Sequence, residues 1–162
     1  MYEKSKYYSL LFEVFVHATE DLERVRKALL FILSEEYRER VSIKNELLVG
    51  SWGNKIIILK LKSKSEDLVK ETISRIFTNL SKVEREDILS NLFNQVDRKG
   101  SFYLRISKQN ALLQRFSLDQ EGGIIRCIFK FKTSVGEKKS EAIRYLKDLI
   151  STNDIEMLKN KV

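Results

Sequence analysis

Cysteine, histidine and proline are scarce or absent in this sequence of 162 residues. The single cysteine, Cys127, cannot form a disulfide bond within the chain, which is typical of proteins from a reducing compartment. The single histidine, His17, excludes a metal site built on two histidines, and one cysteine adds too few ligands for a structural zinc site. With no proline, no Ser/Gly-rich stretch and no visible repeat, the chain shows no domain boundary before roughly the last 25 residues.

Long apolar runs are missing as well. The N-terminal stretch MYEKSKYYSLLFEVFV is charged at its start and interrupted by Glu13, so it fits neither a signal peptide nor a membrane span. A composition of 43% hydrophobic and 33% charged residues is that of a soluble globular protein, long enough to bury most of its apolar surface. We therefore expect a cytoplasmic protein with no membrane partner.

Positive charge is abundant and unevenly distributed. The formal net charge is +7, and the segment from Asp97 to Lys139 contains ten Lys or Arg residues against four Asp or Glu residues. A local positive field favours a polyanionic partner, either a nucleic acid or an anionic membrane surface. The alternative is a basic protein whose Lys-rich surface is merely solvated.

Apolar residues alternate in five segments and recur at helical spacing in four others. The predicted strands cover residues 8–18, 42–49, 55–62, 102–107 and 124–132, with a shorter extended piece near 115–118. The predicted helices cover residues 19–33, 65–80, 81–100 and 137–150. This pattern predicts an α+β fold, a two-layer sandwich with the helices on one face of a mixed or antiparallel sheet. We expect one domain over residues 1–136, with residues 137–162 forming a C-terminal helix and tail that pack on it or extend from it.

Cap residues define the expected helix ends. Thr19 is the predicted N-cap of the first helix, and Ser81 and Glu84 have the spacing of a capping box. Gly100 is the predicted C-terminal cap of the helix over residues 81–100. The apolar stripe of that helix is predicted to contain Ile88, Leu89, Leu92, Phe93 and Val96.

Alternation in the strands also predicts the composition of the sheet face that the helices leave open. That face is expected to carry a basic surface with one aromatic ring, formed by Lys60, Lys62, Tyr103, Arg105, Arg126, Lys130 and Lys132. Cations can contact phosphates and an exposed ring can stack on a base, although Lys and Arg are also ordinary on a solvated sheet face. Three apolar residues on the same face indicate that the last helix or a partner covers part of it: Leu11, Phe15 and Ile128.

The turn GSWGN places the only tryptophan between two glycines at the tip of a predicted hairpin. Gly50 and Gly53 would allow the backbone to turn with positive φ. Trp52 would either fold onto the sheet edge and hold the hairpin, or stand in solvent and contact a partner. We predict that Trp52 is at least partly exposed and contributes to binding, with Asn54 beside it.

Catalytic motifs are weak. A nucleophilic triad would have to use His17, which no flanking motif supports, so His17 is expected at a strand end or helix start. We expect no catalytic residue, no metal and no cofactor. An enzyme acting on nucleic acid would require acidic and basic residues to meet in one cleft, drawn from Glu20, Asp21, Asp119, Arg105 and Lys108.

Three segments together resemble a known family. FVHATEDLERVRKAL is similar to a Val-His-x-Thr-Glu-Asp opening followed by a helix, GSWGNKIIIL to a Gly-His-Tyr-Gly-Asn-Pro-Ile turn, and SFYLRISKQNAL to a Leu-Arg-x-x-Lys-Gln motif. In this order, from about Leu10 to Lys132, they resemble an archaeal family of predicted RNA-binding proteins often described as exosome-associated. The resemblance implies a fold similar to that of a 5S-ribosomal-RNA-binding ribosomal protein, and RNA binding rather than catalysis.

The resemblance also implies which residues matter and where this chain departs from the family. The matching positions are His17, Thr19 and Glu20, then Gly50, Trp52, Gly53 and Asn54, and finally Arg105, Lys108 and Gln109. The turn position of Trp52 usually holds an aromatic residue. Ser51 replaces the turn histidine, Lys55 stands where proline is usual, and DQEGGIIR lacks the acidic residue expected just before Ile124. An activity that needed the histidine or the acid would be lost here.

Two functional hypotheses follow. The first is an RNA-binding module of low sequence specificity that uses the basic sheet face, Trp52 and the segment with Arg105, Lys108 and Gln109. It would be an accessory factor of RNA processing or degradation, with exosome or ribosome-related proteins as further partners. The second is a protein-interaction adaptor whose interface contains Leu11, Phe15 and Ile128. The sequence leaves the oligomeric state open, and a dimer is one option.

Overall fold

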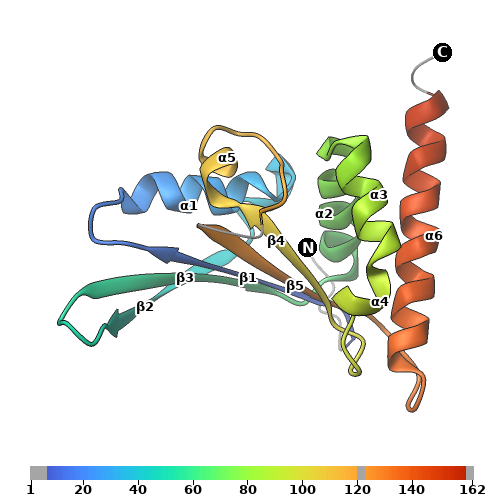
Figure 1. Ribbon diagram of the computed structural model, residues 1–162, viewed down its shortest axis with the longest axis horizontal. Coiled ribbons are helices and arrows are strands. Elements are labelled where there is room, and N and C mark those ends of the chain that lie inside the picture. Colours follow the sequence, from blue (N-terminus) through green and yellow to red (C-terminus); the bar gives the residue numbers. More distant parts are fainter. Residues whose placement is uncertain (1–6, 120–122, 160–162) are drawn as a thin grey trace.

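The structure is a computed structural model that describes residues 7–119 and 123–159, with five strands and six α-helices (Figure 1). The strands are β1 (Ser9–Val16), β2 (Ser42–Val49), β3 (Lys55–Ser63), β4 (Phe102–Ser107) and β5 (Ile124–Lys130). The helices are α1 (Leu22–Phe31), α2 (Glu66–Asn79), α3 (Lys82–Ser90), α4 (Leu92–Gln95), α5 (Lys108–Leu112) and α6 (Lys138–Lys159), and a short 3-10 helix spans Glu35–Tyr37.

The strands form one open antiparallel sheet in the order β2-β3-β1-β5-β4. Figure 1 shows α1 and α5 above one half of the sheet and α2 and α3 above the other half, on the same side. The predicted α+β sandwich with helices on one face is therefore confirmed, and its sheet is antiparallel. Among the described residues, no helix combines the length and apolar character that crossing a membrane requires.

The core lies between the sheet and the helices, as the alternation in the strands predicts. In β1, every second residue from Leu10 to Val16 is buried, and β4 and β5 repeat the pattern. The side chains between them point to the side without helices, which we call the open face. Burial of a large aliphatic side chain contributes about 1.5–3 kcal/mol, so the alternation fixes which face the helices cover.

The N-cap of the first helix lies two residues later than predicted. It is Asp21, whose carboxylate accepts a hydrogen bond from the backbone N–H of Glu23, and not Thr19. Ser65 and Ser81 cap α2 and α3, and the capping box of Ser81 and Glu84 is confirmed.

The helix predicted over residues 81–100 is broken. Asn91 separates α3 from α4, and α4 ends at Gln95, so the predicted cap at Gly100 is wrong. Phe93, predicted on the apolar stripe, is 69% exposed, and the ammonium group of Lys139 lies 3.5 Å from its ring centroid. Gly100 instead has φ of 82° in the turn before β4, and a Cβ there would lie 2.9 Å from the carbonyl oxygen of Lys138.

The last helix is longer than predicted and packs on the domain. α6 contacts α2, and Ala142, Leu146 and Ile150 are buried in the same core as the sheet residues. Near residues 115–118, the predicted extended piece contributes a single bridge, between Leu118 and Ile106. Residues 160–162 of the predicted tail lie outside the described residues.

Candidate nucleic-acid interface

A row of charged residues crosses the open face of all five strands. The register aligns Lys44 with Lys60, Lys60 with Glu13, Glu13 with Arg126, and Arg126 with Arg105. We call these five residues the central charged row. It contains four cations and one carboxylate, so the row has a net positive charge.

Two cross-strand pairs in this row bring like charges together. Lys44 lies opposite Lys60, and Arg105 lies opposite Arg126. Like charges directly opposite each other on a sheet are destabilising, by amounts within the roughly 0.2–1 kcal/mol range of cross-strand pairs. Lys60 is partly compensated by an ion pair with Glu46, at 3.1 Å between Nζ and Oε2. The guanidinium group of Arg126 lies 5.6 Å from the ring centroid of Tyr103.

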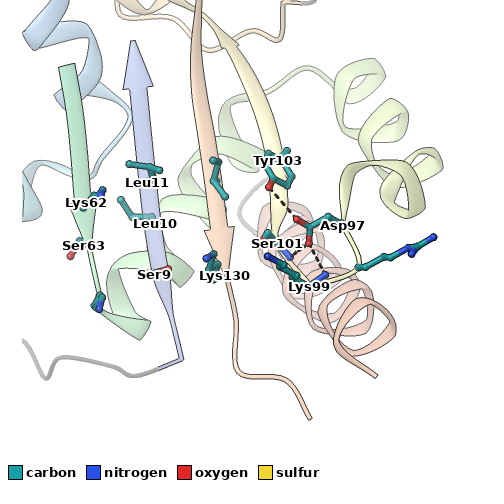
Figure 2. A pocket seen from close by; sticks show the side chains of 13 residues that line it. Ser9, Leu10, Leu11, Lys62, Ser63, Asp97, Lys99, Ser101, Tyr103 and Lys130 are labelled. Atoms are coloured by element: carbon teal, nitrogen blue, oxygen red, sulfur yellow. Dashed lines mark hydrogen bonds between the residues drawn. The ribbon is translucent and has the colours of Figure 1, made fainter. Parts of the chain in front are cut away.

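Next to the central charged row, the open face forms a hollow of about 630 Å³ (Figure 2). The register places Leu11 and Ile128 side by side on its floor, with Lys62 and Tyr103 as their outer neighbours. Five cations line it, contributed by β3, β5, the loop after β3 and the loop before β4: Lys62, Lys64, Arg98, Lys99 and Lys130. We call this feature the sheet hollow.

Tyr103 and Asp97 form one wall of the sheet hollow. The Tyr103 hydroxyl donates a hydrogen bond to Asp97 Oδ2 at 3.1 Å, and Asp97 Oδ1 accepts from the backbone N–H groups of Lys99 and Ser101 (Figure 2). Burial raises the pKa of Tyr103, and the hydrogen bond and charge of Asp97 raise it further. The wall therefore presents a neutral tyrosine in a fixed position.

Other predicted surface cations lie near this face. Lys130 ends β5 beside the sheet hollow, and Lys132 follows the strand, with its ammonium group 5.2 Å from the ring centroid of Tyr7. Arg105 and Arg126 are exposed, as is Gln109 on α5. Of the three apolar residues predicted on this face, Leu11 and Ile128 line the hollow, and Phe15 is 51% exposed.

At the other end of the sheet, the β2–β3 hairpin extends past the end of β1. The last residue of β1 in register is Val16, opposite Ile57, whereas β2 and β3 continue to the pair Val49–Lys55. Trp52 stands at the tip and is 91% exposed, so its predicted exposure is confirmed. Asn54 is also exposed.

The backbone of the tip is closed by two hydrogen bonds. The N–H of Gly53 donates to the carbonyl of Gly50, and the N–H of Gly50 donates to the carbonyl of Asn54. Gly53 has φ of 77°, but Gly50 is outside the left-handed region, so the expectation of positive φ was right for Gly53 only. Leu47, Leu48 and Val49 are exposed on the hairpin beside Trp52.

Lys108, a predicted RNA contact, is 7% exposed and is held inside the protein. Its ammonium group donates to Glu20 Oε1 at 2.8 Å and to the carbonyl of Phe15 at 3.0 Å. Glu20 Oε1 also accepts from the backbone N–H of His17. The buried ion pair thus joins the end of β1 to the start of α5, and in this arrangement Lys108 is not free to contact a phosphate.

Opposing effects set the pKa of Glu20. Burial acts to raise it, but the hydrogen bonds from Lys108 and from the His17 N–H, with the charge of Lys108, outweigh burial and lower the pKa below its ordinary value of 4.5. Glu20 is therefore a charged structural partner of Lys108. His17 and Thr19, the other residues of this motif, are exposed in the same turn.

The position just before Ile124, where the family resemblance implies an acid, lies against this ion pair. A Cβ at Gly123 would be 2.9 Å from Lys108 Cε and 3.5 Å from Lys108 Nζ. A side chain at residue 123 would therefore meet the ammonium group that here pairs with Glu20. Residues 120–122 of the same stretch lie outside the described residues.

Two of the acidic residues considered for catalysis, Glu20 and Asp21, have structural roles. Asp21 caps α1, and the backbone N–H of Asp119 donates to the carbonyl of Arg105 at 3.2 Å. Glu20 and Lys108 meet, but as the closed ion pair described above. In the parts of the chain that the structure describes, no three His, Cys, Asp or Glu side chains are grouped closely enough to hold a metal ion.

Sequence reasoning missed several residues of the open face. Lys44 could have been found, because the hairpin turn pairs Val49 with Lys55 and the antiparallel register then pairs Lys44 with Lys60. Lys64, Arg98 and Lys99 lie in connections between elements, and no periodic pattern places loop residues beside a sheet.

Similar proteins come from archaea. An RNA-binding protein of Pyrococcus abyssi, PAB1135, is 26% identical over 153 residues, which cover 93% of this chain and 98% of that protein. The uncharacterized protein MJ0213 of Methanocaldococcus jannaschii is 27% identical over 143 residues, with 84% and 92% of the two chains covered. Protein AF2318 of Archaeoglobus fulgidus has the same fold, with a TM-score of 0.73 at 24% identity over 91% of this chain and 99% of that chain.

The matches extend over the sheet and the helices that cover it, and they include all three segments on which the resemblance rests. A family model described as RNA binding matches residues 9–131, from the first residue of β1 to just beyond the end of β5. This span is most of the chain, and the protein therefore belongs to this RNA-binding family of archaeal relatives.

Proposed function

We propose that the protein binds RNA through the open face of its sheet, by phosphate contacts and base stacking and with low sequence specificity. The observation that carries the proposal is the two like-charged pairs in the central charged row, Lys44 with Lys60 and Arg105 with Arg126. A merely solvated face gains nothing from such pairs, whereas a chain of phosphates would neutralise both. The family, and the name of the Pyrococcus abyssi relative, agree with this ligand.

We further propose that the protein is a non-catalytic accessory factor of RNA processing or degradation that acts with exosome or ribosome-related proteins. The family resemblance supports this extension. The engagement of Glu20 with Lys108 also supports binding over catalysis, because it leaves that carboxylate unavailable as a base. The competing function is a protein adaptor, which would use the exposed apolar residues of the open face and of the hairpin.

We expect the affinity for RNA to fall steeply with salt. For a single-stranded RNA, the plot of log K against log salt is expected to be linear, with a slope of about −0.7 for each phosphate that the open face contacts. Fluorescence anisotropy with a labelled oligonucleotide measures this slope, and the RNA is expected to remain intact on a gel. No detectable binding to a varied RNA pool at low salt would reject the proposal and favour the adaptor.

Arg105→Gln is expected to change RNA affinity and stability in opposite directions. Removing one of two opposed guanidinium groups should raise the free energy of unfolding by about 0.2–1 kcal/mol, because the repulsion with Arg126 disappears. The same change should weaken RNA binding about two- to fivefold, as expected for one exposed ionic contact. Urea unfolding and anisotropy measure the two effects.

The matched control is Arg24→Gln, which removes one positive charge from the exposed surface of α1, on the other side of the sheet. Its RNA affinity should stay within about twofold of the wild type, because α1 lies outside the open face. Equal weakening by both variants would show that only net charge matters, and would contradict binding at the central charged row.

A further inference from the structure

We infer that the sheet hollow receives one unpaired base of a single-stranded RNA, with the neighbouring phosphates on its cationic rim. This inference rests on the proposed function and adds the class of RNA and the place of one base. A nucleotide suits the hollow because the floor is apolar while the rim is strongly positive.

The floor is suited to the face of a base. Leu11 and Ile128 lie opposite each other on adjacent strands and are only partly buried, so two aliphatic side chains remain open to solvent at the centre of the sheet. Tyr103 lies opposite Ile128 on the next strand and extends the same surface. An apolar floor bordered by a few polar groups is the usual composition of a small-ligand pocket, and the volume of about 630 Å³ is within the usual range for such pockets.

The rim is suited to phosphates on both sides of that base. Figure 2 shows Lys62 at one side of the hollow, Lys130 at the end of β5 and Lys99 on the loop at the other side. Among the described residues that line the hollow, the one carboxylate is Asp97, and its two oxygens already accept hydrogen bonds from Tyr103, Lys99 and Ser101. It therefore holds the wall in place, and the five cations that line the hollow outnumber its single negative charge.

The same arrangement favours single-stranded RNA over a duplex. In an A-form duplex the bases are stacked inside the helix, and the surface offers phosphates and 2′-hydroxyl groups that an apolar floor cannot use. An unpaired nucleotide can place its base on Leu11 and Ile128 while its phosphates meet the rim. Because the Asp97 oxygens are occupied, we also expect little discrimination among the four bases.

The test compares a single-stranded RNA that carries 2-aminopurine at a central position with a duplex of the same length. The wild type should bind the single strand at least about tenfold more tightly and should change the 2-aminopurine fluorescence. The double variant Leu11→Thr/Ile128→Thr places β-branched residues, which favour strands, at both positions, so it should fold. It should bind the single strand about tenfold more weakly, with the fluorescence response lost and duplex binding unchanged.

The control is Val83→Thr, the same kind of substitution at an exposed position of α3 on the helical side, which should behave as the wild type. If the wild type binds RNA with a salt dependence but prefers neither form, and the double variant binds equally well, the hollow is not a base site while the proposed function stands. If the wild type binds no RNA at low salt, the proposed function itself is wrong.

Discussion

Replacing Lys108 by methionine is expected to lower the free energy of unfolding by about 2–3 kcal/mol. Loss of one partner of a buried ion pair costs roughly 3–5 kcal/mol, and the cost here should be smaller because 24% of the Glu20 side chain reaches solvent. Methionine keeps the aliphatic stem that packs against Gly123 but leaves the carbonyl of Phe15 without its ammonium donor. Urea unfolding at neutral pH measures the loss.

The loss should depend on pH in a defined direction. The folded-state pKa of Glu20 lies below its ordinary value of 4.5, so the ion pair contributes stability above that value and loses it as the pH falls through the folded pKa. The difference in stability between the wild type and Lys108→Met should therefore be largest near neutral pH and shrink below about pH 4.5. A difference that grows on acidification would show that the ion pair does not cause it.

Lys82→Met is the matched control, because the ion pair of Lys82 with Glu86 is exposed on the surface of α3. It should change stability by less than about 0.5 kcal/mol. Glu20→Gln should lose about as much stability as Lys108→Met, and the double variant should lose less than the two losses added together, since both remove the same interaction. Fully additive losses would mean that Lys108 and Glu20 do not interact in solution.

The sequence could predict those parts of the fold that depend on the spacing of apolar residues within one strand or helix. Side chains alternate across a strand, so the buried face of β1 from Leu10 to Val16 follows from the sequence alone. The pairing of β2 with β3 was predictable as well, because a short turn joins these two strands. The break at Asn91 was missed because the apolar spacing of residues 81–96 continues across it, and α5 was missed because five residues carry too little periodicity.

The candidate site was less predictable because its contacts are distant in sequence. Lys108 lies in the most basic segment, where an exposed cation is the natural expectation, and its partner Glu20 is 88 residues away. Neither periodicity nor charge count reports such a contact. The family resemblance did include both residues among its motif positions. In the structure, the motif that contains Glu20 contacts the motif that contains Lys108. Part of the shared pattern therefore maintains the fold, while the turn with Trp52 stands apart from it.

Trp52→Ala is expected to weaken RNA binding about five- to hundredfold while changing stability by less than about 0.5 kcal/mol. Stacking a base on an exposed aromatic ring contributes about 1–3 kcal/mol, and an exposed side chain contributes little to folding. The hairpin passes the end of β1 at Val16, so the described structure offers the ring no neighbouring strand to pack on, and Trp52 is 91% exposed. The sequence could not decide this, because a glycine-flanked turn allows both a folded-back and an outward ring.

Trp52→Phe should recover most of the affinity, since it keeps an aromatic face, and Val135→Ala, at a 95% exposed loop position, should have no effect on binding. Because Trp52 is the only tryptophan, its emission reports the site directly: it should be typical of a solvated indole and should be quenched by RNA. Emission that RNA leaves unchanged, with wild-type affinity in Trp52→Ala, would remove the hairpin tip from the RNA interface. The exposed Leu47, Leu48 and Val49 beside it would then mark a protein contact, and the adaptor function would gain support.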